Sequence, residues 1–110
     1  MPFYMYQAAY TSAAWAAQLK KPEARPETIG KQLCEAVGGK LVGAWYSFGE
    51  YDFLLITEMP DAGSAASIAL AAAAGGAIKS AKTTALMSGA DGVAAMQKAA
   101  ALAATYKPVR

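Results

Sequence analysis

The sequence predicts an α+β fold in which helices pack on a four-stranded antiparallel sheet. Three observations lead to this class. Two apolar runs, residues 41–48 and 51–58, are separated only by Gly49-Glu50, which is typical of a β-hairpin. Segments with helical periodicity alternate along the chain with segments typical of strands. The length of 110 residues suits a single domain with a modest core.

The chain begins with a predicted strand and a short helix. Residues 2–10 are rich in aromatic side chains and alternate weakly between apolar and polar, which indicates a strand. Thr11 or Ser12 is the expected N-cap of the helix that follows. This helix carries Trp15 and Leu19 on one face.

A second helix is expected to begin at about Pro26, because proline suits the first turn of a helix. Its large apolar side chains, Ile29, Leu33 and Val37, recur at every fourth position and form one stripe. Gly38-Gly39 then ends the helix in the usual way.

The second half of the chain predicts the hairpin, a third helix and a fourth strand. Glycine at the first position of the Gly49-Glu50 turn favours a type II′ turn, with a positive φ at that glycine. Asp61 is the expected N-cap of an alanine-rich helix, which Gly75-Gly76 ends. Residues 77–87 are then expected to form the fourth strand.

A terminal helix is predicted over residues 90–104, with Ser88 and Asp91 at the spacing of a capping box. Residues 105–110 are expected to form a tail, which leaves residues 1–104 as the single domain. The elements thus follow the order βαββαβ with an added C-terminal helix. Right-handed crossovers arrange this order as a ferredoxin-like sandwich, with strand order 4-1-3-2 and the helices on one face.

Both faces of the predicted hairpin carry apolar side chains. A two-residue turn pairs Phe48 with Tyr51, Tyr46 with Phe53, Ala44 with Leu55 and Val42 with Thr57 on one face, and Ser47 with Asp52, Trp45 with Leu54, Gly43 with Ile56 and Leu41 with Glu58 on the other. Helices can cover only one face, and a solvated face should be polar. We therefore expect a homodimer whose sheets pack face to face about a two-fold axis. The alternative is that the C-terminal helix covers the second face within one chain.

A tetrapeptide and several shorter matches carry a family resemblance. The tetrapeptide is Gly49-Glu50-Tyr51-Asp52, and the other matches are Met1-Pro2, Tyr10-Thr11, Arg25, Gly38-Gly39-Lys40-Leu41, Gly43, Tyr46, Glu58, Pro60-Asp61 and Gly76-Ala77-Ile78-Lys79. Over residues 1–88 the chain resembles the GYD-domain family, whose Gly-x-Tyr-Asp motif the tetrapeptide matches. The resemblance implies a ferredoxin-like domain of the dimeric α+β barrel type, without a defined biochemical function.

The chain departs from that family's pattern in the last strand. Lys79 stands where an Arg is usual, and Thr83-Thr84 replaces a Leu-Arg pair. These differences weaken any anion-binding role of this strand. The alanine-rich C-terminal helix is an addition to the pattern.

Composition excludes several classes of function. The chain has no His and a lone Cys34, so a His-ligated haem, a His-based metal site and a zinc site are excluded, and no metal or cofactor is expected. The single Cys also suits a reducing compartment. A net charge of +2 and scattered basic residues argue against nucleic acid. No apolar run approaches the roughly 20 residues of a membrane span. Because the N-terminus also lacks the basic region of a signal peptide, we expect a cytoplasmic protein.

The catalytic candidates are Asp52, Glu50 and Tyr51. Two carboxylates at this spacing could divide acid and base roles between them. Alternatively, Glu50 is a solvated turn residue, and Asp52 accepts backbone N–H bonds or pairs with Arg25 or Lys79. Arg25, at the start of a helix, could clamp a carboxylate or phosphate, or it could simply fix its loop by pairing with Asp52.

A cluster of aromatic side chains on neighbouring strands is the other candidate site. Its members are Tyr4, Tyr6, Tyr46, Phe48, Tyr51 and Phe53. Such a cluster lines a pocket for a planar or apolar ligand, or else forms the core of a dimer. The predicted ligand-binding residues are Arg25, Tyr46, Tyr51, Asp52, Phe53 and Lys79.

These observations predict a homo-oligomeric domain that binds a small organic ligand, in a pocket between sheet and helices or at the dimer interface. The alternative is a cofactor-free enzyme of the dimeric α+β barrel group, such as a monooxygenase, cyclase or isomerase. In that case Asp52 or Glu50 is the base, and Tyr46, Tyr51 and Arg25 orient a carbonyl-bearing substrate. A purely structural assembly module is the third possibility.

Overall fold

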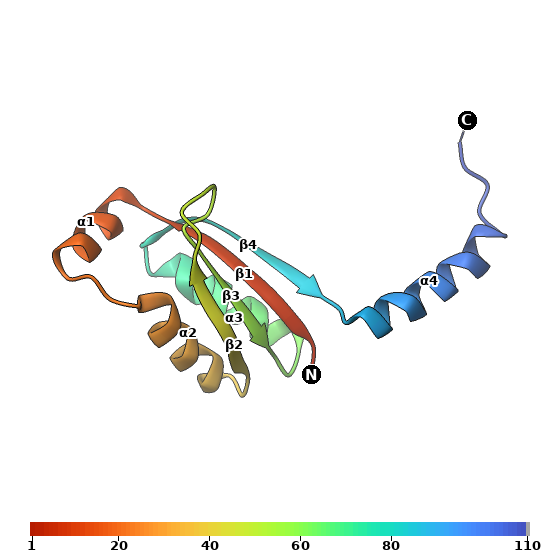
Figure 1. Cartoon of the computed structure of the whole chain (residues 1–110), viewed down its shortest axis with the longest axis horizontal. Coiled ribbons are helices and arrows are strands. Elements are labelled where there is room, and N and C mark those ends of the chain that lie inside the picture. The colour runs from red at the N-terminus through yellow and green to blue at the C-terminus, as the bar shows by residue number, and fades with distance from the viewer. Residues whose placement is uncertain (110) are drawn as a thin grey trace.

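The predicted fold class is confirmed by a computed structural model, which describes residues 1–109 (Figure 1). Its elements are β1 (Phe3–Tyr10), α1 (Ser12–Lys20), α2 (Arg25–Ala36), β2 (Lys40–Tyr46), β3 (Phe53–Glu58), α3 (Ala62–Ala74), β4 (Ile78–Leu86) and α4 (Gly89–Ala103). The strands form one sheet in the order β2-β3-β1-β4, and every neighbouring pair is antiparallel. This is the predicted 4-1-3-2 order of a ferredoxin-like sandwich.

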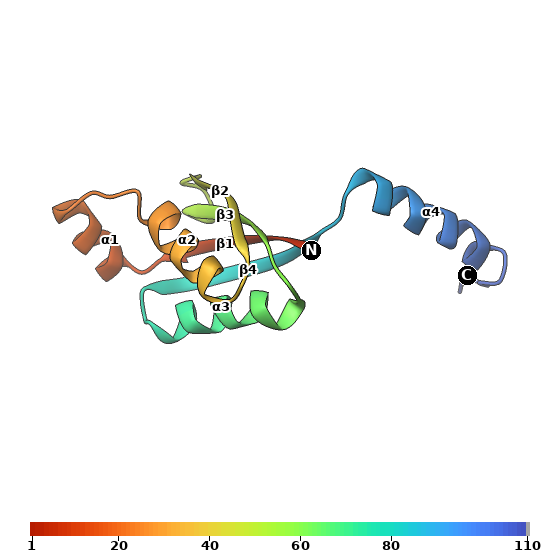
Figure 2. The same cartoon turned by 90° about the horizontal axis from the view of Figure 1, so that it is seen from below.

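Helices α2 and α3 pack side by side on one face of the sheet, which we name the covered face (Figure 2). The core beneath them consists of two clusters. One contains the sheet residues Tyr6, Ala8, Tyr10, Phe53 and Leu55. The other joins the two helices to the end of β3 through Cys34, Met59, Ala65 and Ile68. Burial raises the pKa of the Cys34 thiol, so this side chain acts as a small apolar core residue.

The predicted N-caps are confirmed. Thr11 Oγ1 accepts a hydrogen bond from the Ala14 N–H at 3.1 Å, and Ser88 Oγ accepts one from the Asp91 N–H at 3.1 Å. Asp61 Oδ1 accepts from the Ser64 N–H at 2.7 Å, and this bond holds the pKa of Asp61 below its ordinary value. These caps could be predicted from the sequence because each capping residue lies only three positions before the residue whose N–H it binds.

The predicted type II′ turn between β2 and β3 is wrong. The strands stop at Tyr46 and resume at Phe53, so that residues 47–52 form a wider loop. Its positive φ, 49°, occurs at Phe48 and not at Gly49. A left-handed backbone at a bulky residue costs about 1 kcal/mol or more. The stacking of Phe48 on Tyr46, with ring centroids 5.2 Å apart, offsets this cost.

Four of the predicted cross-strand pairs are confirmed: Tyr46 with Phe53, Trp45 with Leu54, Ala44 with Leu55 and Gly43 with Ile56. The pairs of Val42 with Thr57 and of Leu41 with Glu58 are wrong, because the register shifts between Leu41 and Gly43. Phe48 with Tyr51 and Ser47 with Asp52 lie in the loop beyond the ladder. The shift places Leu41 opposite Thr57, on the covered face, where it packs against both core clusters. A bulge adds one residue to one strand, and alternation alone does not reveal it.

The second face of the sheet, which we name the open face, has no helix over it. Its apolar side chains are Phe3, Met5, Trp45, Leu54, Ile56 and Leu86. Helix α4 was the alternative cover within one chain, but it extends away from the sheet beyond the end of β4 (Figure 1). None of its residues is buried. The open face is therefore uncovered in the single chain.

Candidate functional site

A cavity of about 270 Å³ lies between the covered face of the sheet and helices α2 and α3. Its wall is mostly apolar. The residues that line it are Tyr6, Tyr10, Phe53, Leu55, Ala77 and Ile78 of the sheet side, Arg25, Pro26, Ile29, Gly30 and Leu33 of α2, and Ile68, Ala71, Ala72 and Gly75 of the α3 segment. Small apolar cavities with a few polar groups are the usual form of ligand sites.

Small residues on both helices keep this space open. On α3 the wall includes Ala71 and Ala72 beside Ile68, and the methyl side chains of the two alanines leave unfilled the volume that larger residues would occupy. On α2, Gly30 lies so close to β3 that an added Cβ would approach Leu55 to 3.2 Å. The close packing of α2 at Gly30 and the short side chains of α3 together define the cavity.

Two tyrosines of β1, Tyr6 and Tyr10, line the cavity from the sheet. The Tyr6 hydroxyl is buried without a hydrogen-bond partner in the described structure, and burial raises its pKa. Burial, followed by the neighbouring Tyr46, raises the pKa of Tyr10 to about 12, although the positive charge of Arg25 opposes the shift. Both hydroxyls are therefore protonated at neutral pH, and each can donate a hydrogen bond.

Arg25 is the charged residue in the cavity wall. It also lines a second, more open hollow beside α1, and this hollow shares Tyr10, Arg25 and Ala77 with the cavity. These three residues therefore border both spaces. We name this junction the mouth of the cavity.

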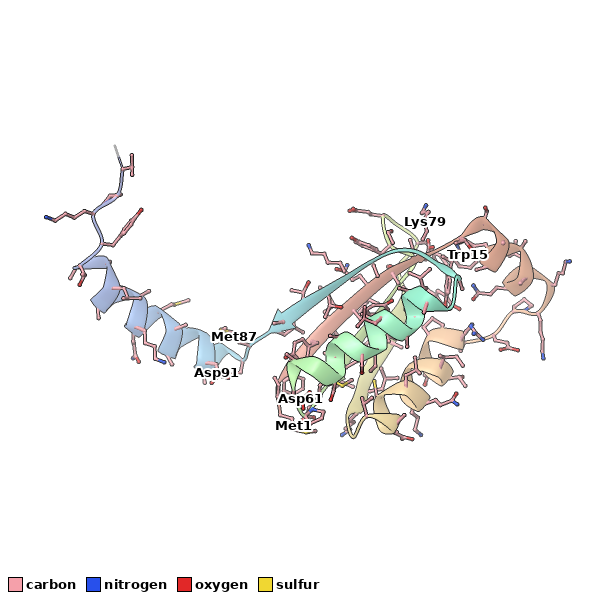
Figure 3. The ribbon with its side chains drawn as sticks, turned by 180° about the vertical axis from the view of Figure 1, so that it is seen from behind. Met1, Trp15, Asp61, Lys79, Met87 and Asp91 are labelled. Atoms are coloured by element: carbon pink, nitrogen blue, oxygen red, sulfur yellow. The ribbon has the colours of Figure 1, made fainter. Side chains whose placement is uncertain are left out.

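Asp52 ties the end of the sheet to α1. Its Oδ2 accepts hydrogen bonds from the Tyr10 N–H at 2.8 Å and from Trp15 Nε1 at 3.1 Å. Tyr10 and Trp15 also pack edge to face, with ring centroids 5.3 Å apart. Figure 3 shows Trp15 at the end of the sheet from which α1 extends, opposite the end where Met87 leads into α4. Asp52 therefore accepts a backbone hydrogen bond, as one of the two alternatives predicted, and the donor is the N–H of Tyr10.

The predicted ligand residues are only partly brought together. Arg25 and Phe53 line the cavity, whereas Tyr46, Tyr51, Asp52 and Lys79 do not, nor does Glu50. The Tyr46 hydroxyl instead donates to the Glu23 carbonyl oxygen at 3.0 Å. Lys79 and Glu50 are exposed, Tyr51 is half-buried, and Figure 3 places Lys79 at the same end of the sheet as Trp15.

Asp52 pairs with neither Arg25 nor Lys79. Within residues 1–109 one ion pair is present, between Lys21 and Glu23, with a nitrogen-to-oxygen distance of 3.5 Å. The catalytic roles of Asp52, Glu50 and Tyr51 stay predictions.

Sequence reasoning missed Tyr10 as a site residue and placed Tyr6 only in the aromatic cluster. The signal was present, because Tyr6 and Tyr10 are an even number of residues apart on one strand and therefore share a face. Which face the helices would cover was not evident from that pattern. The same part of the chain, residues 1–109, holds no group of three or more potential metal ligands, and none of its helices has the length and apolar character to cross a membrane.

Comparison with known proteins supports the fold and identifies a family. The crystal structure of MtbAldR is similar in fold, with a TM-score of 0.54 and a sequence identity of 15%. The similarity covers 79% of this chain and 52% of MtbAldR, so this chain spans about half of that protein's length. At this identity the likeness concerns the fold alone. No curated protein is significantly similar in sequence. The model of the GYD domain, however, matches residues 4–102. The chain therefore belongs to the GYD-domain family.

Proposed function

We propose that this GYD domain is a homodimeric protein that binds a small organic ligand in the cavity between its sheet and helices. The observation that carries the proposal is a mostly apolar cavity of about 270 Å³ whose wall includes one charged side chain, Arg25. Apolar cavities with a few polar groups are the usual form of ligand sites. A ligand that fills this space removes apolar surface from water, which favours binding.

Binding is favoured over catalysis by the position of the charged groups. The predicted bases, Asp52 and Glu50, do not line the cavity, and Asp52 Oδ2 already accepts two hydrogen bonds. Tyr10, with its pKa raised to about 12, holds its proton too tightly to act as a base near neutral pH. The cavity therefore offers hydrogen-bond donors and one cation, which suit recognition of a ligand.

The proposed dimer rests on the open face. Six apolar side chains lie there without cover, and Trp45 is 55% exposed. A second copy related by a two-fold axis presents the same surface and buries both. A reducing compartment such as the cytoplasm, which the lone Cys34 favours, is part of the proposal. Light scattering on the eluting protein measures the mass, and a monomer at micromolar concentration would rule out the dimer.

The ligand is tested by native mass spectrometry of the protein purified from cells. We expect an added mass that disappears on denaturation, and the variant Ala72→Leu to lose it because a larger side chain fills the cavity. Ala73→Leu is the matched control, since Ala73 is exposed on the same helix and does not line the cavity. Retention of the same mass by Ala72→Leu would contradict binding in this cavity.

A further inference from the structure

We infer that the ligand is a small monocarboxylate with an apolar body, whose carboxylate is held by Arg25 at the mouth of the cavity. This inference rests on the proposed binding function and names its ligand class. Three independent features carry it: the charge at the mouth, the start of helix α2, and the size and lining of the interior.

The charge at the mouth favours an anion. Arg25 is the charged residue in the cavity wall, and it takes no part in the ion pair formed within residues 1–109. The outer hollow is lined by Lys21, Glu23 and Arg25, of which Lys21 and Glu23 pair with each other at 3.5 Å. One positive charge therefore remains, and a planar guanidinium matches a carboxylate with two parallel hydrogen bonds.

The start of α2 adds to this preference. The helix begins at Arg25, and its first two residues, Arg25 and Pro26, both line the cavity. Ala24, the N-cap residue, has no side-chain oxygen to bond the free N–H groups of the first turn. The partial positive charge of a helix N-terminus then favours an anion nearby. Glu27 in the same turn balances part of it, which is why one negative charge fits better than two.

The interior specifies the rest of the ligand. Apart from Arg25 the wall is mostly apolar, and its larger side chains include Ile29, Leu33, Phe53 and Ile78. Because a cavity of about 150 Å³ accepts benzene, a cavity of about 270 Å³ accepts a molecule of roughly 10–12 non-hydrogen atoms. The hydroxyl of Tyr10, on which the charge of Arg25 acts, can donate a hydrogen bond to the carboxylate. A phenyl-substituted or medium-chain carboxylate has these properties.

Calorimetric titration with two probes of equal shape tests the inference. The probes are 3-phenylpropanoate and its neutral amide. We expect the carboxylate to bind at least about ten-fold more tightly than the amide, as a charge-assisted pair allows. Arg25→Gln should remove this preference by lowering the affinity for the carboxylate to about that for the amide. Lys21→Gln is the matched control, because Lys21 lies in the outer hollow, is exposed and is already paired, so that it should preserve the preference.

Three outcomes contradict parts of the proposal separately. Equal binding of both probes, lost in Ala72→Leu, would overturn the carboxylate inference and leave cavity binding intact. Carboxylate binding that Ala72→Leu does not change would place it elsewhere and overturn the proposed function as well. Binding of neither probe, nor of octanoate, at millimolar concentration would also overturn the carboxylate inference, whereas native mass spectrometry would still test the cavity itself.

Discussion

The two faces of the sheet are similarly apolar, yet only one of them is covered. On the covered face, Tyr6, Phe53 and Leu55 are 4–6% exposed. On the open face, Phe3 and Trp45 are 39% and 55% exposed. The helices can occupy only one side, because both right-handed crossovers lead the chain to the same face. The other two helices, α1 and α4, extend from opposite ends of the sheet (Figure 1).

This difference separates two kinds of recognition. The covered face and its helices, with their small side chains, leave a partly open cavity that suits a small molecule. The open face is broad and carries no helix, so it suits a flat partner such as another copy of the sheet. In this fold, the proposed ligand site and the proposed partner surface lie on opposite sides of the same four strands.

The largest effect is expected at the open face. Ile56→Lys places a charge at the centre of the proposed dimer interface, and burying it without a partner costs several kcal/mol. We expect light scattering to report a monomer with an unchanged circular dichroism spectrum. Ile56→Val is the control and should remain dimeric. A dimer in Ile56→Lys would mean that the copies associate through another surface.

The second-largest effect is expected from substituting two adjacent leucines whose side chains lie on opposite faces of the sheet. Leu55→Ala should destabilise the fold by about 3 kcal/mol, because Leu55 is buried beneath the helices. Leu54→Ala should cost about 1 kcal/mol in the dissociated chain, where this side chain is only half-buried. Urea unfolding at protein concentrations below dimer dissociation gives both values. Equal losses would show that the open face is covered even in the monomer.

Asp52→Ala tests the hydrogen bonds that hold the end of the sheet to α1. The change leaves the Tyr10 N–H and Trp15 Nε1 without their acceptor, and we expect a loss of about 2 kcal/mol in the free energy of unfolding. Glu50→Ala, two residues away and exposed, should change stability by less than about 0.5 kcal/mol. If the two variants were equally stable, Asp52 would not be the tie between the sheet and α1.

Tyr6→Phe should produce the smallest change in the free energy of unfolding, and any change should be a gain in stability. Removing a hydroxyl that has no partner should leave the free protein as stable as before, or more stable by about 1 kcal/mol. Binding of 3-phenylpropanamide and 3-phenylpropanoate should be unchanged, because the Tyr6 oxygen has no accessible surface in the cavity. Thermal unfolding without ligand and calorimetry with ligand measure the two effects. A marked destabilisation would show that the hydroxyl is satisfied within the protein.

Much of the fold could be predicted, and less of the site. The N-caps Thr11, Asp61 and Ser88 are local signals, and the strand order followed from the element order with right-handed crossovers. Arg25 and Phe53 were predicted as ligand residues and lie in the cavity wall. The other predicted ligand residues lie outside it. Tyr46 and Tyr51 were predicted from the aromatic cluster and Asp52 from its acidic neighbour Glu50, whereas in the structure Asp52 holds β1 and α1 together.

The sequence by itself determined the class of fold, its element order and the apolar character of both sheet faces. These depend on caps and periodicities that extend over only a few residues. The tertiary structure decided the bulge at Val42, the wide loop at residues 47–52 and the cavity. A bulge depends on the partner strand, and a cavity depends on how far apart side chains from four distant segments are held. Such distances are absent from any local pattern, which is why the covered face and its site became evident only in the folded chain.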